Sequence, residues 1–84
     1  ADLERVLTSL RLAEEQIVLA AEAVEVAAED MRVVEERYRL GAATSIDLLQ
    51  SQTALVEAEQ TLVNARYDYM IARAQLEALV GRQL

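Results

Sequence analysis

Apolar residues recur through the first half of the chain at alternating spacings of three and four, the heptad pattern of helices that pack side by side. They form one seam, made of Leu3, Val6, Leu10, Ala13, Ile17, Ala20, Val24, Ala27, Met31, Val34 and Tyr38. Acidic residues spaced seven apart lie on the opposite side, at Glu15, Glu22, Glu29 and Glu36. This amphipathic pattern predicts a helix over residues 2–40.

The second half repeats the pattern and predicts a second helix, over residues 45–80. Its seam consists of Leu48, Ser51, Leu55, Ala58, Leu62, Ala65, Tyr69, Ala72, Leu76 and Leu79. Alanines of the two seams stand equally far from the centre of the chain, so that an antiparallel arrangement sets Ala13 beside Ala72 and Ala20 beside Ala65, with Ala27 beside Ala58. Such small residues allow two helices to approach closely.

Residues 41–44 carry the signals of a tight turn between the two helices. Gly41 can adopt the left-handed conformation that ends a helix, and Thr44 or Ser45 can cap the next one. Thr44 and Asp47 have the spacing of a capping box, in which Asp47 also lies at the positive end of the helix dipole. The sequence therefore predicts an all-α fold in which residues 1–84 form a single long antiparallel α-helical hairpin, a coiled coil of two arms about 55 Å long.

Each helix carries a second apolar line that one hairpin cannot bury. The helix-1 line consists of Leu12, Leu19, Val26, Val33 and Leu40, and the helix-2 line consists of Leu49, Val56, Val63 and Met70. Both lines lie well away from the seam, so a monomer would leave them in water. We therefore expect lateral packing of hairpins into a homo-oligomer, either a bundle of two hairpins or a ring that forms an α-barrel.

The composition excludes most chemistry. The chain contains no Cys, His, Trp, Phe or Pro, and fifteen acidic residues against eight arginines give a net charge of −7. We expect no enzyme, no cofactor and no metal site; Glu22, Glu25 and Glu29 lack the His that accompanies Glu in di-iron bundles. The negative charge argues against nucleic acid as a partner and against binding to anionic lipid.

Targeting and membrane segments are also not expected in this sequence. The first ten residues are charged from the second position onward and lack the apolar centre of a signal peptide. The longest uncharged helical run, residues 48–56, is too short to cross a bilayer. The segment is therefore expected to be water-soluble, with no direct membrane insertion of its own.

The turn and the second helix resemble the TolC-type outer membrane efflux protein family. Members of that family show a Tyr-x-x-Gly-like turn, then Thr or Ser, then an acid followed by two aliphatic residues, and a long Ala-rich helix ending in Leu-x-x-x-x-Gly. The matching residues in this chain are Tyr38, Gly41, Thr44, Asp47, Leu48, Leu49, the run from Ala65 to Tyr67, and residues 76–81.

The resemblance implies a hairpin from the periplasmic α-barrel of a Gram-negative outer membrane channel, whose tip docks a periplasmic adaptor (membrane fusion) protein. By this resemblance the adaptor would meet Leu40, Gly41, Ala42, Ala43 and Thr44, with Tyr38 and Asp47 linked to tip contacts or closure. Some members carry Arg at the position of Ala43 and an acid at that of Gln50, so a salt-bridged gate is not expected in this chain.

Several of these residues also fit purely structural roles, and the sequence alone does not decide between the two. Tyr38 also fits a seam position and Asp47 a simple helix cap, while Tyr67, Tyr69 and Met70 fit packing positions between helices. The sequence lacks the β-strands of a complete channel and so looks like an excised or engineered piece. The alternative function is a self-associating structural coiled-coil hairpin with no transport role of its own.

Overall fold

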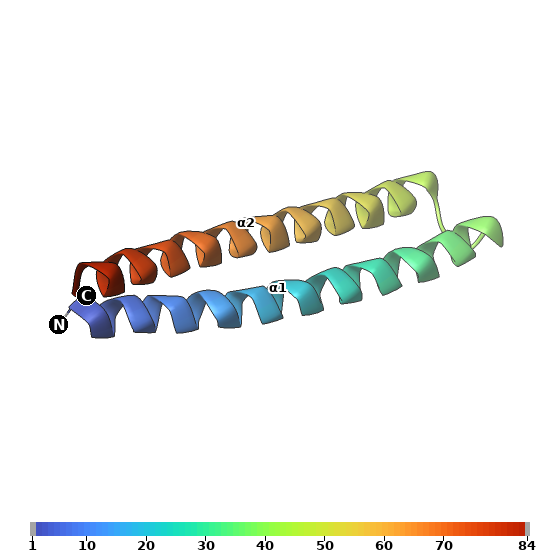
Figure 1. Ribbon diagram of the computed structural model, residues 1–84. Coiled ribbons are helices and arrows are strands. Elements are labelled where there is room, and N and C mark those ends of the chain that lie inside the picture. The colour runs from blue at the N-terminus through green and yellow to red at the C-terminus, as the bar shows by residue number, and fades with distance from the viewer. Residues whose placement is uncertain (1, 84) are drawn as a thin grey trace.

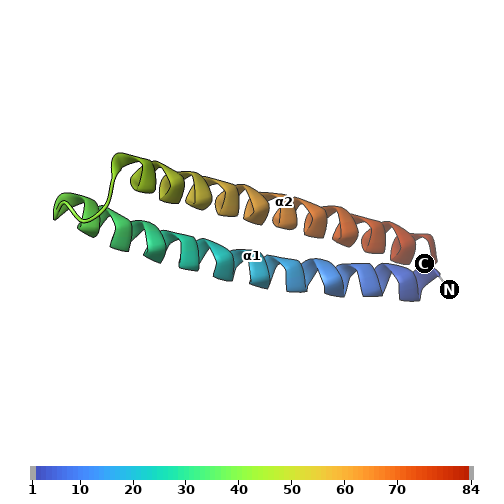
Figure 2. The ribbon, with the colours of Figure 1, turned by 180° about the vertical axis from the view of Figure 1, so that it is seen from behind.

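The computed structural model describes residues 2–83, which form two long antiparallel helices joined by a short turn (Figure 1). Helix α1 spans Asp2–Arg39 and helix α2 spans Ser45–Gln83. The helices lie side by side along their whole length and bring both chain ends to the same end of the molecule, as the reverse view also shows (Figure 2). The predicted all-α hairpin is confirmed.

The molecule is a rod with principal extents of 64 × 14 × 13 Å. Acidic residues in the first turn of α1 and Arg37 and Arg39 in its last turn match the helix dipole, with negative charge at the N-terminus and positive charge at the C-terminus. Helix α2 likewise carries an acid, Asp47, in its first turn. The charged residues named here therefore have the signs that stabilise the ends of the two helices.

The seam is where the structure buries its side chains. The four buried residues among those described are Ala13, Ala20, Ala65 and Ala72, which are the alanine pairs that an antiparallel register sets side by side. The larger seam residues between them, such as Ile17 and Leu62, are half-buried. No large side chain in the described part of the chain is completely buried, so one hairpin has no dry core comparable to that of a globular domain.

The C-terminal ends of both helices differ slightly from the predicted ones. Helix α1 ends at Arg39, one residue before the predicted end, because Leu40 belongs to the turn that Gly41 forms. Helix α2 continues to Gln83 rather than stopping at residue 80, and Gly81 is helical. A glycine ends a helix when it adopts a positive φ, which Gly41 does and Gly81 does not.

Candidate partner-binding tip

Helix α1 ends at the tip in a Schellman motif centred on Gly41. This residue has a φ of 79°, in the left-handed region that only glycine adopts at little cost. Its N–H donates to the carbonyl oxygen of Tyr38 at 3.1 Å, and the N–H of Ala42 donates to that of Arg37 at 2.7 Å. These two bonds satisfy carbonyl groups at the end of the helix and turn the chain sharply towards α2.

Helix α2 begins with a reciprocal capping box. The backbone N–H of Thr44 donates to Oδ2 of Asp47 at 2.9 Å, and the backbone N–H of Asp47 donates to Oγ1 of Thr44 at 3.1 Å. The predicted box is therefore confirmed. The hydrogen bond from the Thr44 N–H, with the Thr44 hydroxyl as a smaller cause, lowers the pKa of the Asp47 carboxyl below its ordinary value. Capping thus gives Asp47 a structural role at the tip.

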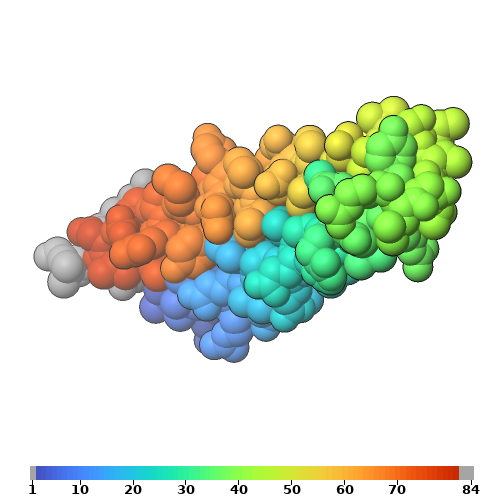
Figure 3. Space-filling model, turned by 90° about the vertical axis from the view of Figure 1, so that its right-hand side faces the viewer, coloured from blue at the N-terminus to red at the C-terminus, as the bar shows by residue number. Residues whose placement is uncertain are grey.

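Apolar side chains are exposed around this rigid turn. Leu40 is 73% exposed and Ile46 is 65% exposed, and they flank the turn on its two sides. Ala42 is exposed and Ala43 half-buried. In the space-filling view from the tip side, the green atoms of the turn stand on the outer surface of the molecule (Figure 3). Exposed apolar groups on a rigid turn form a surface that a partner can cover without first ordering a loop.

Tyr38 occupies the last predicted seam position but is 46% exposed. The end of α1 reaches beyond the start of α2 at the tip (Figure 1), so α2 does not extend far enough to cover the ring. The seam packing predicted for Tyr38 is therefore incomplete, and much of its ring faces solvent beside the turn. This exposure leaves Tyr38 accessible from the tip.

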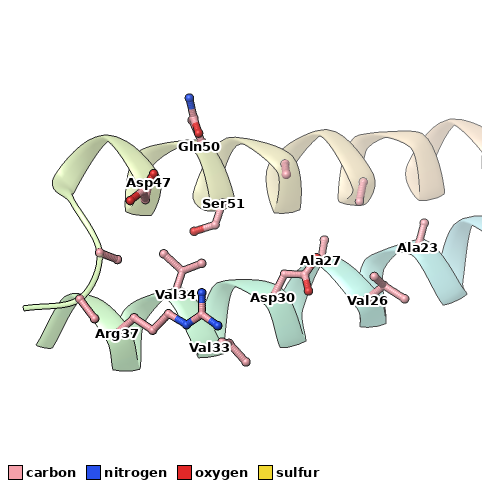
Figure 4. A pocket seen from close by; sticks show the side chains of 14 residues that line it. Ala23, Val26, Ala27, Asp30, Val33, Val34, Arg37, Asp47, Gln50 and Ser51 are labelled. Atoms are coloured by element: carbon pink, nitrogen blue, oxygen red, sulfur yellow. The ribbon is translucent and has the colours of Figure 1, made fainter. Parts of the chain in front are cut away.

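A groove of about 980 Å³ opens between the helices next to the tip. Its walls consist mainly of small residues, with Ala23, Ala27 and Val34 on α1 and Ser51, Ala54 and Ala58 on α2. Val34 and Ser51 point towards one another from the two helices (Figure 4). Ala27 and Ala58 are only half-buried, because two short side chains do not fill the space that separates the helices near the tip.

Polar groups stand at the edges of the groove, namely those of Asp30, Arg37, Asp47 and Gln50. Asp30, Arg37 and Gln50 were not predicted as site residues. The available signal was the repeat of small residues at Ala23, Ala27, Ala54 and Ala58 on the same side of both helices. We call the face of the hairpin on which this groove opens the groove face.

The two additional apolar lines are exposed, as predicted for a single hairpin. The residues whose side chains are more than half exposed are Leu12, Leu19, Val26, Leu40, Leu49, Val56, Val63 and Met70. Val33 differs because it is half-buried beside the groove, which it lines together with Val26. Tyr67, at 62% exposure, lies on the surface of α2 instead of packing between the helices, whereas Tyr69 is half-buried in the seam.

Ion pairs stabilise the tip half of α1 locally. Arg32 donates to both carboxylate oxygens of Glu29, at 3.0 and 2.7 Å, and Arg39 pairs with Glu36. The hydrogen bond from Arg32, reinforced by its charge, lowers the pKa of Glu29. On α2, Arg73 pairs with Glu77 at 3.3 Å. All three pairs are exposed and link residues three or four apart, so they support the helices rather than build a site.

Two further findings concern the described residues alone. Neither α1 nor α2 has a stretch apolar and long enough to pass through a bilayer. Across residues 2–83, no three acidic side chains converge into a group that could hold a metal ion.

Comparison with known proteins supports the resemblance to outer membrane efflux proteins that the turn and the second helix suggest. The chain is 38% identical over 48 residues to the outer membrane protein TolC of Escherichia coli strain K12, and equally so to that of Salmonella enteritidis. The matched segment covers 57% of this chain and 10% of each TolC, so the chain spans a small part of the relatives it matches. No solved structure matches it significantly.

The family description "Outer membrane efflux protein" matches residues 1–82, almost the whole chain, including both helices and the turn that joins them. With this match across the full hairpin, the chain belongs to the outer membrane efflux protein family.

Proposed function

We propose that this hairpin is a periplasmic segment of a TolC-like outer membrane efflux channel in a Gram-negative bacterium, and that its tip docks a periplasmic adaptor (membrane fusion) protein. The single observation that carries the proposal is the rigid, uncovered tip. A Schellman motif and a capping box fix its backbone, while Leu40 and Ile46 stand exposed beside it. In this role the chain is a non-enzymatic duct element.

The contact surface of the proposed docking site consists of Tyr38, Leu40, Gly41, Ala42, Ala43, Thr44 and Asp47. Gly41, Ala42 and Ala43 have little or no side chain, so an adaptor could approach the backbone of the turn closely. The adjoining groove, walled by alanines and edged by polar groups such as Arg37 and Gln50, offers space for a protruding side chain or helix end. Apolar centre and polar edge are the arrangement of protein interfaces.

Lateral packing into an α-barrel is the second part of the proposal. The surfaces for it are the helix-1 line and the helix-2 line, residues Leu12, Leu19, Val26, Val33, Leu49, Val56, Val63 and Met70. Their exposure supports this role, because contiguous apolar surface on a small rod without a dry core indicates a missing neighbour. In a barrel each helix would have a neighbour on both sides.

Ala42→Glu tests adaptor docking. The substitution places a charged side chain on an exposed turn residue, so helix content measured by circular dichroism should stay unchanged while binding of the adaptor to the immobilised chain is lost. Ala28→Glu, the same change at an exposed position in the middle of α1, is the matched control and should bind normally. Unchanged adaptor binding by Ala42→Glu would refute docking at the tip and favour a purely structural hairpin.

A further inference from the structure

Arg37 is the arginine in the tip half of α1 that has no acidic partner among the described residues. Arg32 and Arg39 each have a glutamate three residues earlier in the helix, and each is paired with it. Arg37 has valines three and four residues earlier, at Val34 and Val33, so no acid lies one turn before it. Its guanidinium group is therefore an unneutralised positive charge at the edge of the groove.

Asp47 lies across the groove from Arg37. Both residues line the groove, Arg37 from the last turn of α1 and Asp47 from the first turn of α2. The antiparallel register that sets Ala20 beside Ala65 also sets Arg37 level with residue 48, one position from Asp47. Each of the two charged residues immediately precedes a seam residue of its helix. Such positions beside the seam are where coiled-coil helices form ion pairs with one another.

The Asp47 carboxylate has an oxygen free for such a pair. Its Oδ2 accepts the N–H of Thr44 at 2.9 Å in the capping box, whereas its Oδ1 accepts no hydrogen bond from the described residues. The bond from Thr44 also lowers the pKa of this carboxyl, so Asp47 is negatively charged near neutral pH. An arginine that donates to Oδ1 would therefore leave the cap intact.

The Arg37 side chain runs along α1 in the direction of Asp30 instead of crossing to Asp47 (Figure 4). Arg37 is exposed, so rotation about its side-chain bonds is enough to redirect it, without movement of either helix. Asp30 is the competing acid, but it lies two helical turns away, about 10.5 Å along the axis, and no ion pair joins it to Arg37. These three are the titratable residues that line the groove.

An arginine that crosses to Asp47 would cover the tip end of the groove. Val34 and Ala43 line this end and are half-buried. The aliphatic part of an arginine side chain can lie over such apolar surface while the guanidinium group stays in water. Ala23, at the other end of the groove, is fourteen residues from Arg37, about 21 Å along α1, and lies beyond its reach.

We propose that Arg37 is a strap that crosses the groove to Oδ1 of Asp47 and closes its tip end, so that any partner entering there must first displace it. This inference goes beyond the proposed function, because the ion pair forms within one hairpin and needs no adaptor. An exposed ion pair changes an equilibrium by about fivefold at most. The strap therefore joins the adjacent ends of α1 and α2 and still opens readily.

A double-mutant cycle tests the ion pair. Arg37→Gln and Asp47→Asn are compared singly and together by urea unfolding, at a concentration where sedimentation shows a monomer. Asparagine keeps an oxygen for the Thr44 N–H, so the cap is retained. The two substitutions should be coupled about twofold to fivefold in the unfolding equilibrium constant at low salt, and less as salt is added. Independent effects of the two substitutions would overturn the ion pair.

The matched control is the same cycle with Asp30→Asn in place of Asp47→Asn. Asp30 is an exposed aspartate on the same groove, so the charge removed is the same and only its position differs. Arg37→Gln and Asp30→Asn should act independently. Coupling of Arg37 to Asp30 and not to Asp47 would overturn the strap, because the arginine would then pair along α1 and leave the groove open.

NMR titration gives a second reading of the same contact. Arg37→Gln removes the positive charge beside Asp47 and should raise the pKa of its carboxyl. Glu29, whose pKa is held low by Arg32, should titrate unchanged. An unchanged pKa of Asp47 in the Arg37→Gln variant would overturn the ion pair.

A neutral gadolinium chelate in solution measures whether the strap closes the groove, because it broadens the NMR signals of accessible methyl groups. The methyl signals of Val34 and Ala43 should be broadened more in Arg37→Gln than in the unmodified chain. The Ala23 methyl signal, beyond the reach of Arg37, is the control and should be broadened equally in both. Equal broadening of Val34 and Ala43 in the two chains would overturn closure of the groove.

Discussion

Two glycines in this chain should respond to the same substitution with opposite signs. Gly41 has a φ of 79° and ends α1, whereas Gly81 lies within α2 without a positive φ. A Cβ added at either position would meet no atom within 4 Å, so neither alanine creates a clash. Any difference between Gly41→Ala and Gly81→Ala therefore reports the backbone conformation alone.

The expected magnitudes follow from that conformation. An L-residue in the left-handed region costs about 1–2 kcal/mol, and the reduced freedom of the unfolded chain returns about 0.4–1 kcal/mol. Gly41→Ala should therefore lower the free energy of unfolding by about 1 kcal/mol, which for a chain of this size shifts Tm by about 5 °C. Gly81→Ala should raise it by about 0.5 kcal/mol, less than in a helix centre because it lies in the last turn.

Urea and thermal unfolding followed by circular dichroism measure both changes, at a protein concentration where sedimentation shows a monomer, because association would add its own stability. Gly41→Asn provides a third point and should lie between glycine and alanine, since Asn tolerates the left-handed region. If Gly41→Ala were neutral or stabilising, a strained left-handed residue would not govern the turn, and the argument for a rigid tip would fail.

Three further predictions concern the cap and the seam. Thr44→Ala removes the Oγ1 acceptor of the Asp47 N–H and should lower the free energy of unfolding by about 1 kcal/mol in urea unfolding; no loss would show that the box is not formed in solution. Because the pKa of Asp47 is lowered on folding, the contribution of Asp47 to the free energy of unfolding should be complete above the ordinary aspartate pKa and be lost as pH falls through the lowered value. NMR titration should find the pKa of Asp47 in the folded chain below its pKa in an unfolded peptide, and equal values would contradict the capping box. Ala20→Leu should lower the free energy of unfolding by about 1–3 kcal/mol, because the larger side chain forces the helices apart at a buried position. Ala74→Leu, at an exposed position, should stay within about 0.5 kcal/mol, and equal effects of the two would indicate a different register.

The sequence by itself determined the parts of this protein that depend on residues close together along the chain. The heptad spacing predicted both helices and the seam, and the buried alanines Ala13, Ala20, Ala65 and Ala72 confirm its register. The end of α1 at Gly41 and the capping box of Thr44 and Asp47 were also predictable, because each depends on hydrogen bonds within one turn of backbone.

Only the tertiary structure decided what the two helices form together. The groove near the tip, with Asp30, Arg37 and Gln50 at its edges, depends on the separation of the helices, which spacing along one helix does not specify. The exposure of Tyr38 depends on where α2 begins relative to the end of α1. The half-buried position of Val33 beside the groove, on a line that is otherwise exposed, likewise required the two helices to be set against each other, because the direction of a side chain on one helix acquires a face only when its neighbour is in place.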